Sequence, residues 1–320
     1  MRDRASALFP TSFILTSFMT LEKTASDRLA ALVASRGPTC LGFDPRLDWS
    51  PPEFRPRGPD AESAASAITG FFHAVLDAAG AHASAVKLQA AFFERWLAPG
   101  FAAFVACCRA AKDRGLFVLA DVKRGDIGTT SEAYADAYLG PVGSDPPVAD
   151  AVTISPYLGT DGLKPFFQTA EKNHGLTFTL VKTSNPSSKE LQDLIVDGRT
   201  VAERVAEIVE TESRRTMGQC GYGAAGAVVG ATHPEELGKF RRAMPHAWLL
   251  LPGYGAQGAG AADVVDAFDD RGLGALVAAS RSLNYPWGSS AAPSDWRTRI
   301  TDAAKSMRDD LASVRRRRAT

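Results

Sequence analysis

The feature that most constrains the fold is a repeating alternation of short apolar runs with longer segments of helical periodicity. The runs are almost continuously apolar, which is typical of strands buried on both faces of a parallel sheet. Eight runs follow one another, at residues 39–44, 84–89, 116–123, 150–155, 176–182, 226–231, 246–253 and 274–280. Eight strand-plus-helix repeats predict an α/β fold, a single closed (β/α)8 TIM barrel, rather than an open sheet.

Length and linkers favour one folded domain. The chain has 320 residues, a size that α/β barrels commonly reach as a single domain. No stretch is rich enough in Pro, Gly or Ser to divide it. We expect an N-terminal extension over residues 1–25 that is disordered in part, a barrel domain over 26–312, and a solvated basic tail over 313–320.

Charge and cysteine content exclude several function classes. The chain carries 36 Lys and Arg against 36 Asp and Glu, so its formal net charge is zero. This balance argues against nucleic acid or an anionic membrane as a partner, and no apolar run approaches the roughly 18 residues of a membrane span. The four cysteines lack C-x-x-C spacing and the five histidines lack metal-ligand spacing. This indicates reduced thiols in a cytoplasmic protein and no dedicated metal site.

Polar side chains gather at the C-terminal ends of the predicted strands. In a barrel the chemistry lies at that end, while the strand interiors fill the core. The third run ends in LADVKRGDIGTT, residues 119–130, which places two acids and two bases within six residues. Because side chains alternate along a strand, Asp121 and Lys123 should share a face and meet Lys87 of the neighbouring strand.

Such a charged set can be structural or functional. An ion pair that only plugs the barrel is costly, because buried charges seldom stabilise a fold relative to apolar packing. We therefore favour a functional role for Lys87, Asp121 and Lys123. Asp126 alone could be an ordinary loop acid that caps the helix beginning near Thr129.

Two further segments predict an anion site. Residues 252–260, PGYGAQGAG, form a glycine-rich turn with available backbone N–H groups and one side-chain amide, Gln257. Arg281 follows the eighth run directly. Barrels often hold a phosphate with the loops after strands seven and eight, and arginine suits bidentate phosphate contact. The two loops together predict a phosphate site.

These motifs resemble those of the orotidine 5′-phosphate decarboxylase family. The most specific match is DVKRGDI, residues 121–127, which fits the family's D-x-K-x-x-D-I signature. FDPR, VKLQAAFFE, TSNP, PGYGAQG and SR, at the first, second, fifth, seventh and eighth runs, also match. The resemblance spans nearly the whole barrel and is closest to the longer bacterial and mycobacterial-type branch.

The resemblance implies decarboxylation of orotidine 5′-monophosphate to UMP, the last step of de novo pyrimidine synthesis, without metal or organic cofactor. It also implies a homodimer with shared active sites, in which Lys87, Asp121 and Lys123 form a charged network. The other implied roles are these: Asp126 and Thr130 come from the partner subunit, Asp44 binds a ribose hydroxyl, Ser184 meets the pyrimidine, and Gln257 and Arg281 hold the phosphate.

The implied reaction makes one electrostatic demand. Loss of CO2 from C6 leaves an electron pair in an sp2 orbital outside the ring π-system, with no cofactor to accept it. A fixed ammonium beside C6 would stabilise this carbanion and protonate it, and Lys123 is the candidate. Asp121 and Asp126 would hold the ammonium in place and keep it charged.

Three alternatives stay open. A Mg2+-dependent phosphosugar decarboxylase or synthase of the same barrel suprafamily shares the D-x-K-x-x-D element but needs a further acid, for which Glu94 is the nearest candidate. A Schiff-base aldolase could use Lys87, Lys123 or Lys182, although acids rather than apolar groups flank Lys123. A barrel that only binds phosphate would not require all four charges.

Overall fold

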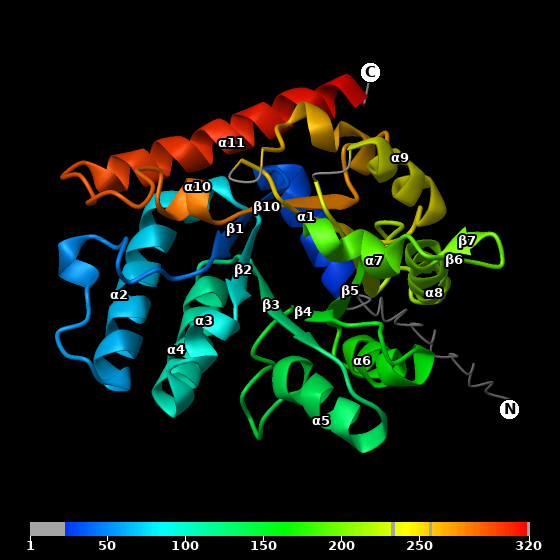
Figure 1. Cartoon of the computed structure of the whole chain (residues 1–320), viewed down its shortest axis with the longest axis horizontal. Helices are drawn as coiled ribbons and strands as arrows, with labels where there is room; N and C mark the ends of the chain where they lie inside the picture. The colour runs from blue at the N-terminus through cyan, green and yellow to red at the C-terminus, as the bar shows by residue number, and fades with distance from the viewer. Residues whose placement is uncertain (1–22, 232–233, 256–257, 319–320) are drawn as a thin grey trace, which may run out of the picture.

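Eight parallel strands close into a barrel in the computed structural model, which describes residues 23–231, 234–255 and 258–318 (Figure 1). The strands are β1 (Thr39–Phe43), β2 (Ala85–Gln89), β3 (Phe117–Arg124), β4 (Ala151–Ile154), β5 (Leu176–Lys182), β8 (Ala225–Val229), β9 (Leu249–Pro252) and β10 (Ala275–Ala279). Around the barrel their order is β1-β10-β9-β8-β5-β4-β3-β2. The predicted α/β barrel is confirmed, and each strand begins and ends within three residues of its expected run.

Helices cover the outer face of the barrel (Figure 1). They are α2 (Ala61–Ala79), α3 (Ala91–Glu94), α4 (Leu97–Asp113), α5 (Gly128–Leu139), α6 (Thr160–Lys172), α8 (Val201–Arg215), α9 (Pro234–Ala243), α10 (Arg281–Asn284) and α11 (Trp296–Arg318). The larger core lies between these helices and the outward faces of the strands, where Phe71, Phe104 and Phe166 are fully buried. The β5–α8 connection also holds the short helix α7 (Lys189–Gln192) and a hairpin of β6 (Ile195–Val196) and β7 (Arg199–Thr200).

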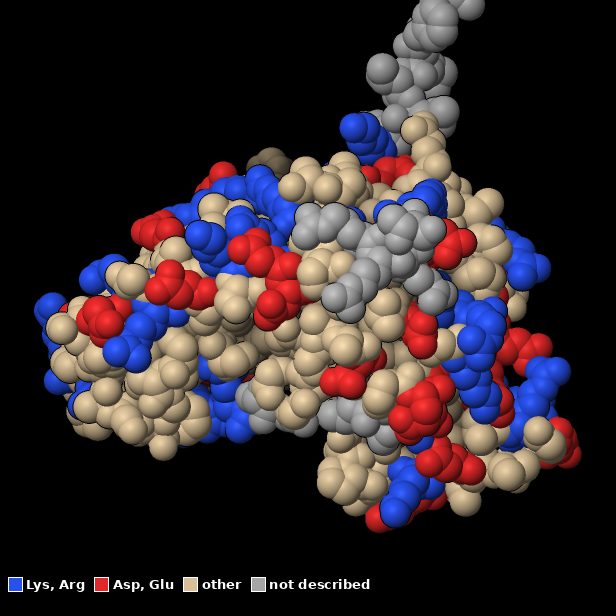
Figure 2. Space-filling model, turned by 90° about the horizontal axis from the view of Figure 1, so that it is seen from above, with Lys and Arg blue, Asp and Glu red and all other residues tan. Residues whose placement is uncertain are grey.

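Among the residues that the structure describes, one segment, Ala61–His82, is long and apolar enough to cross a membrane by length and composition. Its apolar window is 56% buried inside the protein, and α2 packs against α4 and α11. This is the pattern of a core helix of the barrel. On the face shown in Figure 2, acidic and basic side chains are interspersed, as the zero net charge suggests.

A second core fills the interior of the barrel. Phe117, Phe178 and Trp248 point inward from their strands or strand ends and are almost completely buried. The helix α1 (Ala25–Arg36) packs against this core, with Leu29 and Val33 fully buried. Apolar side chains therefore fill the barrel toward the N-terminal ends of the strands. The C-terminal ends of the strands are left for polar side chains.

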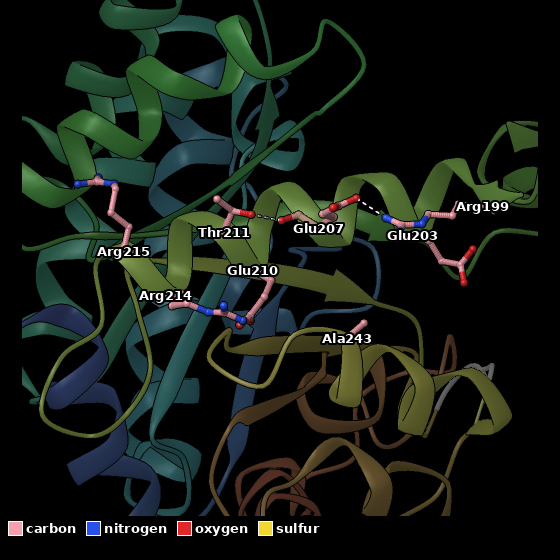
Figure 3. Close-up of a pocket in the computed structure, with 8 residues that line it drawn as sticks. All are labelled: Arg199, Glu203, Glu207, Glu210, Thr211, Arg214, Arg215 and Ala243. Carbon is pink, nitrogen blue, oxygen red and sulfur yellow. Dashed lines mark hydrogen bonds and ion pairs between the residues drawn. The ribbon is translucent and has the colours of Figure 1, made fainter. Parts of the chain in front are cut away.

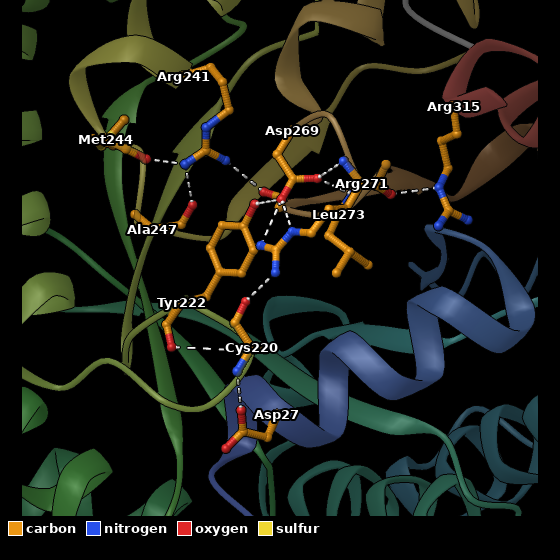
Figure 4. Close-up of polar contacts among 12 residues, drawn as sticks. Asp27, Cys220, Tyr222, Arg241, Met244, Ala247, Asp269, Arg271, Leu273 and Arg315 are labelled. Carbon is orange, nitrogen blue, oxygen red and sulfur yellow. Dashed lines mark hydrogen bonds and ion pairs between the residues drawn. The ribbon is translucent and has the colours of Figure 1, made fainter. Parts of the chain in front are cut away.

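A polar network ties together the loops at the N-terminal ends of β8, β9 and β10 (Figure 4). Tyr222 donates its hydroxyl to Asp269 over 2.8 Å, and the buried guanidinium of Arg241 donates to backbone carbonyls. Asp27 of α1 accepts a hydrogen bond of 2.8 Å from the amide of Cys220. Contacts at this end of a barrel stabilise the fold rather than bind ligands.

The last helix extends past the predicted domain boundary. We expected a solvated tail from residue 313, but α11 continues to Arg318. Arg315 is partly buried, and its guanidinium donates to the carbonyls of Gly272, over 2.6 Å, and Val33, over 3.1 Å. A run of arginines looks solvated in a sequence, but here its first member binds one carbonyl of helix α1 and one of the loop before β10. Most of the expected N-terminal extension, residues 1–22, lies outside the described residues.

Candidate active site

The C-terminal ends of the strands surround a cavity of about 510 Å3. Six residues predicted from the sequence line it: Asp44, Lys87, Asp121, Lys123, Ser184 and Arg281. They come from five different strands or the loops that follow them, which is how a barrel assembles a site from distant parts of a chain. The opposite end of the barrel contributes none of them.

A buried carboxylate lies at the centre of the cavity floor, between two lysines. Asp121 Oδ2 is 2.6 Å from Lys87 Nζ, and Asp121 Oδ1 is 2.5 Å from Lys123 Nζ. The side chains of Lys87 and Asp121 are 8% and 7% exposed, whereas that of Lys123 is 45% exposed. The predicted convergence of these residues is confirmed, and Lys123 is the member of the set that is open to a ligand.

The electrostatics of this trio keep the carboxylate of Asp121 and the ammonium of Lys87 charged. Burial alone would raise the pKa of the Asp121 carboxyl, but the ammonium groups of Lys87 and Lys123 outweigh burial and hold that pKa well below its ordinary value. Burial alone would lower the pKa of Lys87, but Asp121 and Asp44 outweigh it and raise that pKa above its ordinary value. The trio therefore carries one net positive charge.

Two side chains that we had not assigned to the site hold Asp121 in place. Gln89 donates to Asp121 Oδ2 over 3.0 Å, and the hydroxyl of Thr153 donates to Asp121 Oδ1 over 3.0 Å. Thr153 occupies an inward position on the neighbouring strand β4 and is 1% exposed. The sequence does hold a signal for this role of Thr153, namely a hydroxyl residue at an inward position of an otherwise apolar strand.

The end of β3 is irregular, so simple alternation does not explain the position of Lys123. The β3–β4 register shifts between Ala120 and Arg124, and Lys123 has a φ of 47°, a left-handed conformation that costs roughly 1–2 kcal/mol. Thr153 Oγ1 accepts from the amides of both Val122 and Lys123, each over 2.9 Å. The same threonine thus fixes the bulged backbone and the carboxylate that the lysine contacts.

Asp44 offers an unused acceptor at the edge of the trio. Its Oδ1 atom is 4.0 Å from Lys87 Nζ, beyond hydrogen-bond distance. This oxygen is buried and accepts no hydrogen bond within the described structure. A buried acceptor without a donor is costly in a native protein, so a ligand hydroxyl would complete it.

The predicted anion site is described only in part. Arg281 is the first residue of α10 and lines the cavity, together with Gly253 and Tyr254 of the loop after β9. Gln257, the second predicted phosphate ligand, lies outside the described residues.

Two predicted site residues do not line the cavity of their own chain. Asp126 accepts a hydrogen bond of 2.8 Å from the amide of Ile127, and Thr130 is exposed on the first turns of α5. The alternative in which Asp126 caps this helix is wrong, because α5 begins at Gly128 without a side-chain cap.

A second hollow, of about 660 Å3, lies on the outer face of α8 (Figure 3). Its charges already neutralise one another: Arg199 contacts Glu207 at 2.7 Å, and Arg214 contacts Glu210 at 3.4 Å. None of the eight barrel strands contributes to it. Paired charges along an exposed helix are typical of a solvated face rather than a catalytic site.

Comparison with known proteins identifies the family. Residues 60–283 match the model described as the orotidine 5′-phosphate decarboxylase / HUMPS family, which is more than half of the chain. The chain belongs to this family.

Relatives within the orotidine 5′-phosphate decarboxylase / HUMPS family extend the match to most of the chain. Orotidine 5′-phosphate decarboxylase of Rhodopirellula baltica is 42% identical over 291 residues, which cover 88% of this chain and 96% of the relative. The protein of that name from Deinococcus radiodurans is 43% identical over 273 residues, covering 85% and 90%. The solved structure of Leishmania donovani OMP decarboxylase is 32% identical, covers 91% of this chain and 98% of that one, and has a TM-score of 0.71.

For this member of the decarboxylase / HUMPS family, the Mg2+-dependent alternative is not favoured, since these relatives carry the decarboxylase name. Glu94, the extra acid which that alternative needs, is paired with the guanidinium of Arg124. Among the residues that the structure describes, no three His, Cys, Asp or Glu side chains are grouped as metal ligands.

Proposed function

We infer that this chain decarboxylates orotidine 5′-monophosphate to UMP and CO2, the last step of de novo pyrimidine synthesis, and is therefore a carboxy-lyase. The relatives that match over nearly their whole length carry this activity in their names. The observation that carries the assignment in this chain is the buried Asp121 carboxylate held between Lys87 and Lys123 at the mouth of the barrel. The reaction needs a fixed positive charge, and this cavity has one.

Lys123 is the proposed catalytic group. Its side chain is 45% exposed toward the cavity while that of Lys87 is 8% exposed, so Lys123 is the ammonium that a substrate can reach. As CO2 leaves C6, this ammonium stabilises the developing carbanion and then donates a proton to C6. Asp121 orients the ammonium and Lys87 neutralises Asp121, which leaves the positive charge of Lys123 uncompensated by the trio.

The strand order gives the proposed orientation of the nucleotide. Arg281 and Asp44 follow β10 and β1, which are adjacent in the barrel, so the phosphate and the ribose would lie side by side there. The unused Oδ1 of Asp44 would accept a ribose hydroxyl. Ser184 follows β5 on the other side of the mouth, where the pyrimidine would lie. In this orientation C6 would lie near Lys123, between the two.

A homodimer with shared active sites is a further part of the proposal. Asp126 and Thr130 lie outside the cavity of their own chain, so their proposed roles require a second copy. The loops beside them expose apolar side chains, with Tyr157 82% and Ile127 54% exposed. The hydroxyl of Ser131 donates to the carbonyls of Asp126 and Gly162, which links the loop after β3 to α6. An exposed apolar group rimmed by polar residues is typical of a subunit interface.

We also propose that the protein works in the cytoplasm. Its four cysteines are free thiols, and Cys40, Cys107 and Cys108 are buried. Free thiols persist in reducing compartments.

An absorbance assay with orotidine 5′-monophosphate tests the proposed activity. Purified protein in EDTA should consume the orotate chromophore and produce UMP, and heat-denatured protein should not. Activity that appears only after Mg2+ is added would favour the metal-dependent alternative. A stable chromophore under both conditions would contradict the proposed function.

A further inference from the structure

The β5–α8 connection is anchored by a buried lysine that the proposed chemistry does not use. Lys182 ends β5, and its side chain is 2% exposed, yet it does not line the cavity. Its ammonium forms an ion pair with Asp193 and lies 3.7 Å from Glu236. Asp193 directly follows α7, so this contact ties that short helix to the end of β5, over which Figure 1 shows it.

The residue before Asp193 lines the active-site cavity. Gln192 Oε1 accepts from the backbone amide of Thr183 over 2.9 Å, and its Nε2 donates to the hydroxyl of Thr183 over 2.8 Å. Because a backbone N–H can only donate, the first contact fixes which end of the carboxamide is oxygen. A carboxamide nitrogen has two hydrogens, and one of them has no acceptor among the described residues.

The position of Gln192 at the barrel mouth favours a contact with the pyrimidine rather than with the phosphate. It lies beside Ser184 and Asn185 on the β5 side of the cavity, three strands from β10 and Arg281. The phosphate calls for positive charge, which Arg281 supplies. An uncharged N–H donor on the far side instead suits the uncharged carbonyl groups of the pyrimidine.

We propose that Gln192 is a further substrate-binding residue that donates its remaining N–H to a pyrimidine carbonyl, and that the ion pair between Lys182 and Asp193 is what positions it. The inference rests on the proposed function, because it names a contact to the base of the same substrate. Gln192 contacts the ligand directly, whereas Lys182 and Asp193 act only by positioning Gln192.

The test compares two ligands that differ in the base. Gln192→Ala should weaken UMP binding by about five- to tenfold, the effect of one neutral hydrogen bond, and leave the binding of ribose 5-phosphate unchanged. Gln192→Glu, which keeps the length but loses the donor, should behave in the same way. The KM for orotidine 5′-monophosphate should rise more than kcat falls. Gln168→Ala, on the exposed surface of α6, is the matched control and should resemble wild type.

The positioning role is tested at Asp193. Asp193→Asn should reproduce the loss of UMP affinity with normal ribose 5-phosphate binding, and Asp193→Glu should restore it. Adding Gln192→Ala to Asp193→Asn should cause little further loss, since both changes remove the same contact. Equal losses for the two ligands, or losses that multiply in the double variant, would overturn the positioning role.

The experiments distinguish a failure of the proposed function from a failure of the proposed Gln192 contact. If the wild-type protein neither turns over orotidine 5′-monophosphate nor binds UMP, the proposed function fails and the inference fails with it. If the wild type is active but Gln192→Ala binds UMP with wild-type affinity, the function stands and the contact to the base is wrong.

Discussion

At the scale of single residues, Thr153 supports both the backbone of β3 and the carboxylate of Asp121. Its hydroxyl oxygen accepts from two successive amides of β3 and its proton goes to Asp121. One side chain of β4 therefore sets the bulge that carries Lys123 and the orientation of the carboxylate beside it. The geometry of the charged trio depends on this neutral residue.

We expect Thr153→Val to impair catalysis and stability together. The substitution keeps the shape but removes a donor to a charged group, a change of about 1.5–3 kcal/mol, so kcat/KM should fall by about 10- to 100-fold. Thr153→Ser keeps the hydroxyl and should recover most of the activity. Steady-state kinetics of both variants provide the measurement, and a valine variant with wild-type kcat/KM would show that the threonine does not organise the site.

The sequence predicted the charged residues but not the bulge or its support. Lys87 and Asp121 could be placed together because they occupy inward positions on the neighbouring strands β2 and β3, whereas the position of Lys123 also depends on the bulge. The role of Thr153 depends on which residue of β3 it faces, and the shift of register between Ala120 and Arg124 fixes that. Strand pairing across a bulge is a tertiary property that alternation along one strand does not contain.

At the scale of elements, α1 packs on the inner core at the end of the barrel opposite to the active site. Asp27 ties it down in two ways, since its carboxylate forms a capping box with Thr24 and accepts from the amide of Cys220. Burial alone would raise the pKa of Asp27, but these hydrogen bonds outweigh burial and lower it. A carboxyl with a lowered pKa in the folded protein contributes stability above its unfolded pKa and loses it as the pH falls through the folded value.

Asp27→Asn should therefore reduce stability at neutral pH and matter less in acid. We expect a loss of about 1 kcal/mol near pH 7, as for a helix cap. The difference from wild type should shrink below about pH 4, the ordinary pKa of aspartate. Denaturant unfolding at several pH values measures it. A difference that grows toward low pH would contradict the assigned contacts.

Elements were predictable where they are long and periodic. The eight strands and the main helices repeat one pattern, so each supports the assignment of the next. The helix α7 and the β6–β7 hairpin were not predicted, because four-residue and two-residue elements carry no periodicity of their own. Contacts such as those of Lys182 and Arg315 hold the ends of elements in place, and these depend on partners that are distant in the sequence.

At the scale of the whole molecule, the proposal requires two chains. The cavity of one chain contains Lys87, Asp121 and Lys123 but not Asp126 or Thr130. If a partner supplies the last two, a dimer of two defective chains can contain one intact site.

Mixing Lys123→Ala chains with Asp126→Asn chains should restore activity. Half of randomly formed dimers are heterodimers, and one of their two sites is wild type, so about a quarter of wild-type activity is expected. Mixing Lys123→Ala with Asp121→Asn provides the control, because both residues come from the same chain and no intact site forms. Verified heterodimers that stay inactive in the first mixture would argue against a shared site.

The most direct measurement of the central claim is the turnover number of Lys123→Ala on orotidine 5′-monophosphate, taken together with its affinity for UMP. We expect kcat to fall by about 10²- to 10⁴-fold or more, as for the loss of a group that both stabilises charge and transfers the proton, while UMP binding remains measurable. Lys164→Ala, on the exposed face of α6, should leave both values at the wild-type level. A Lys123→Ala enzyme that retains appreciable turnover would contradict the claim that this ammonium carries the reaction.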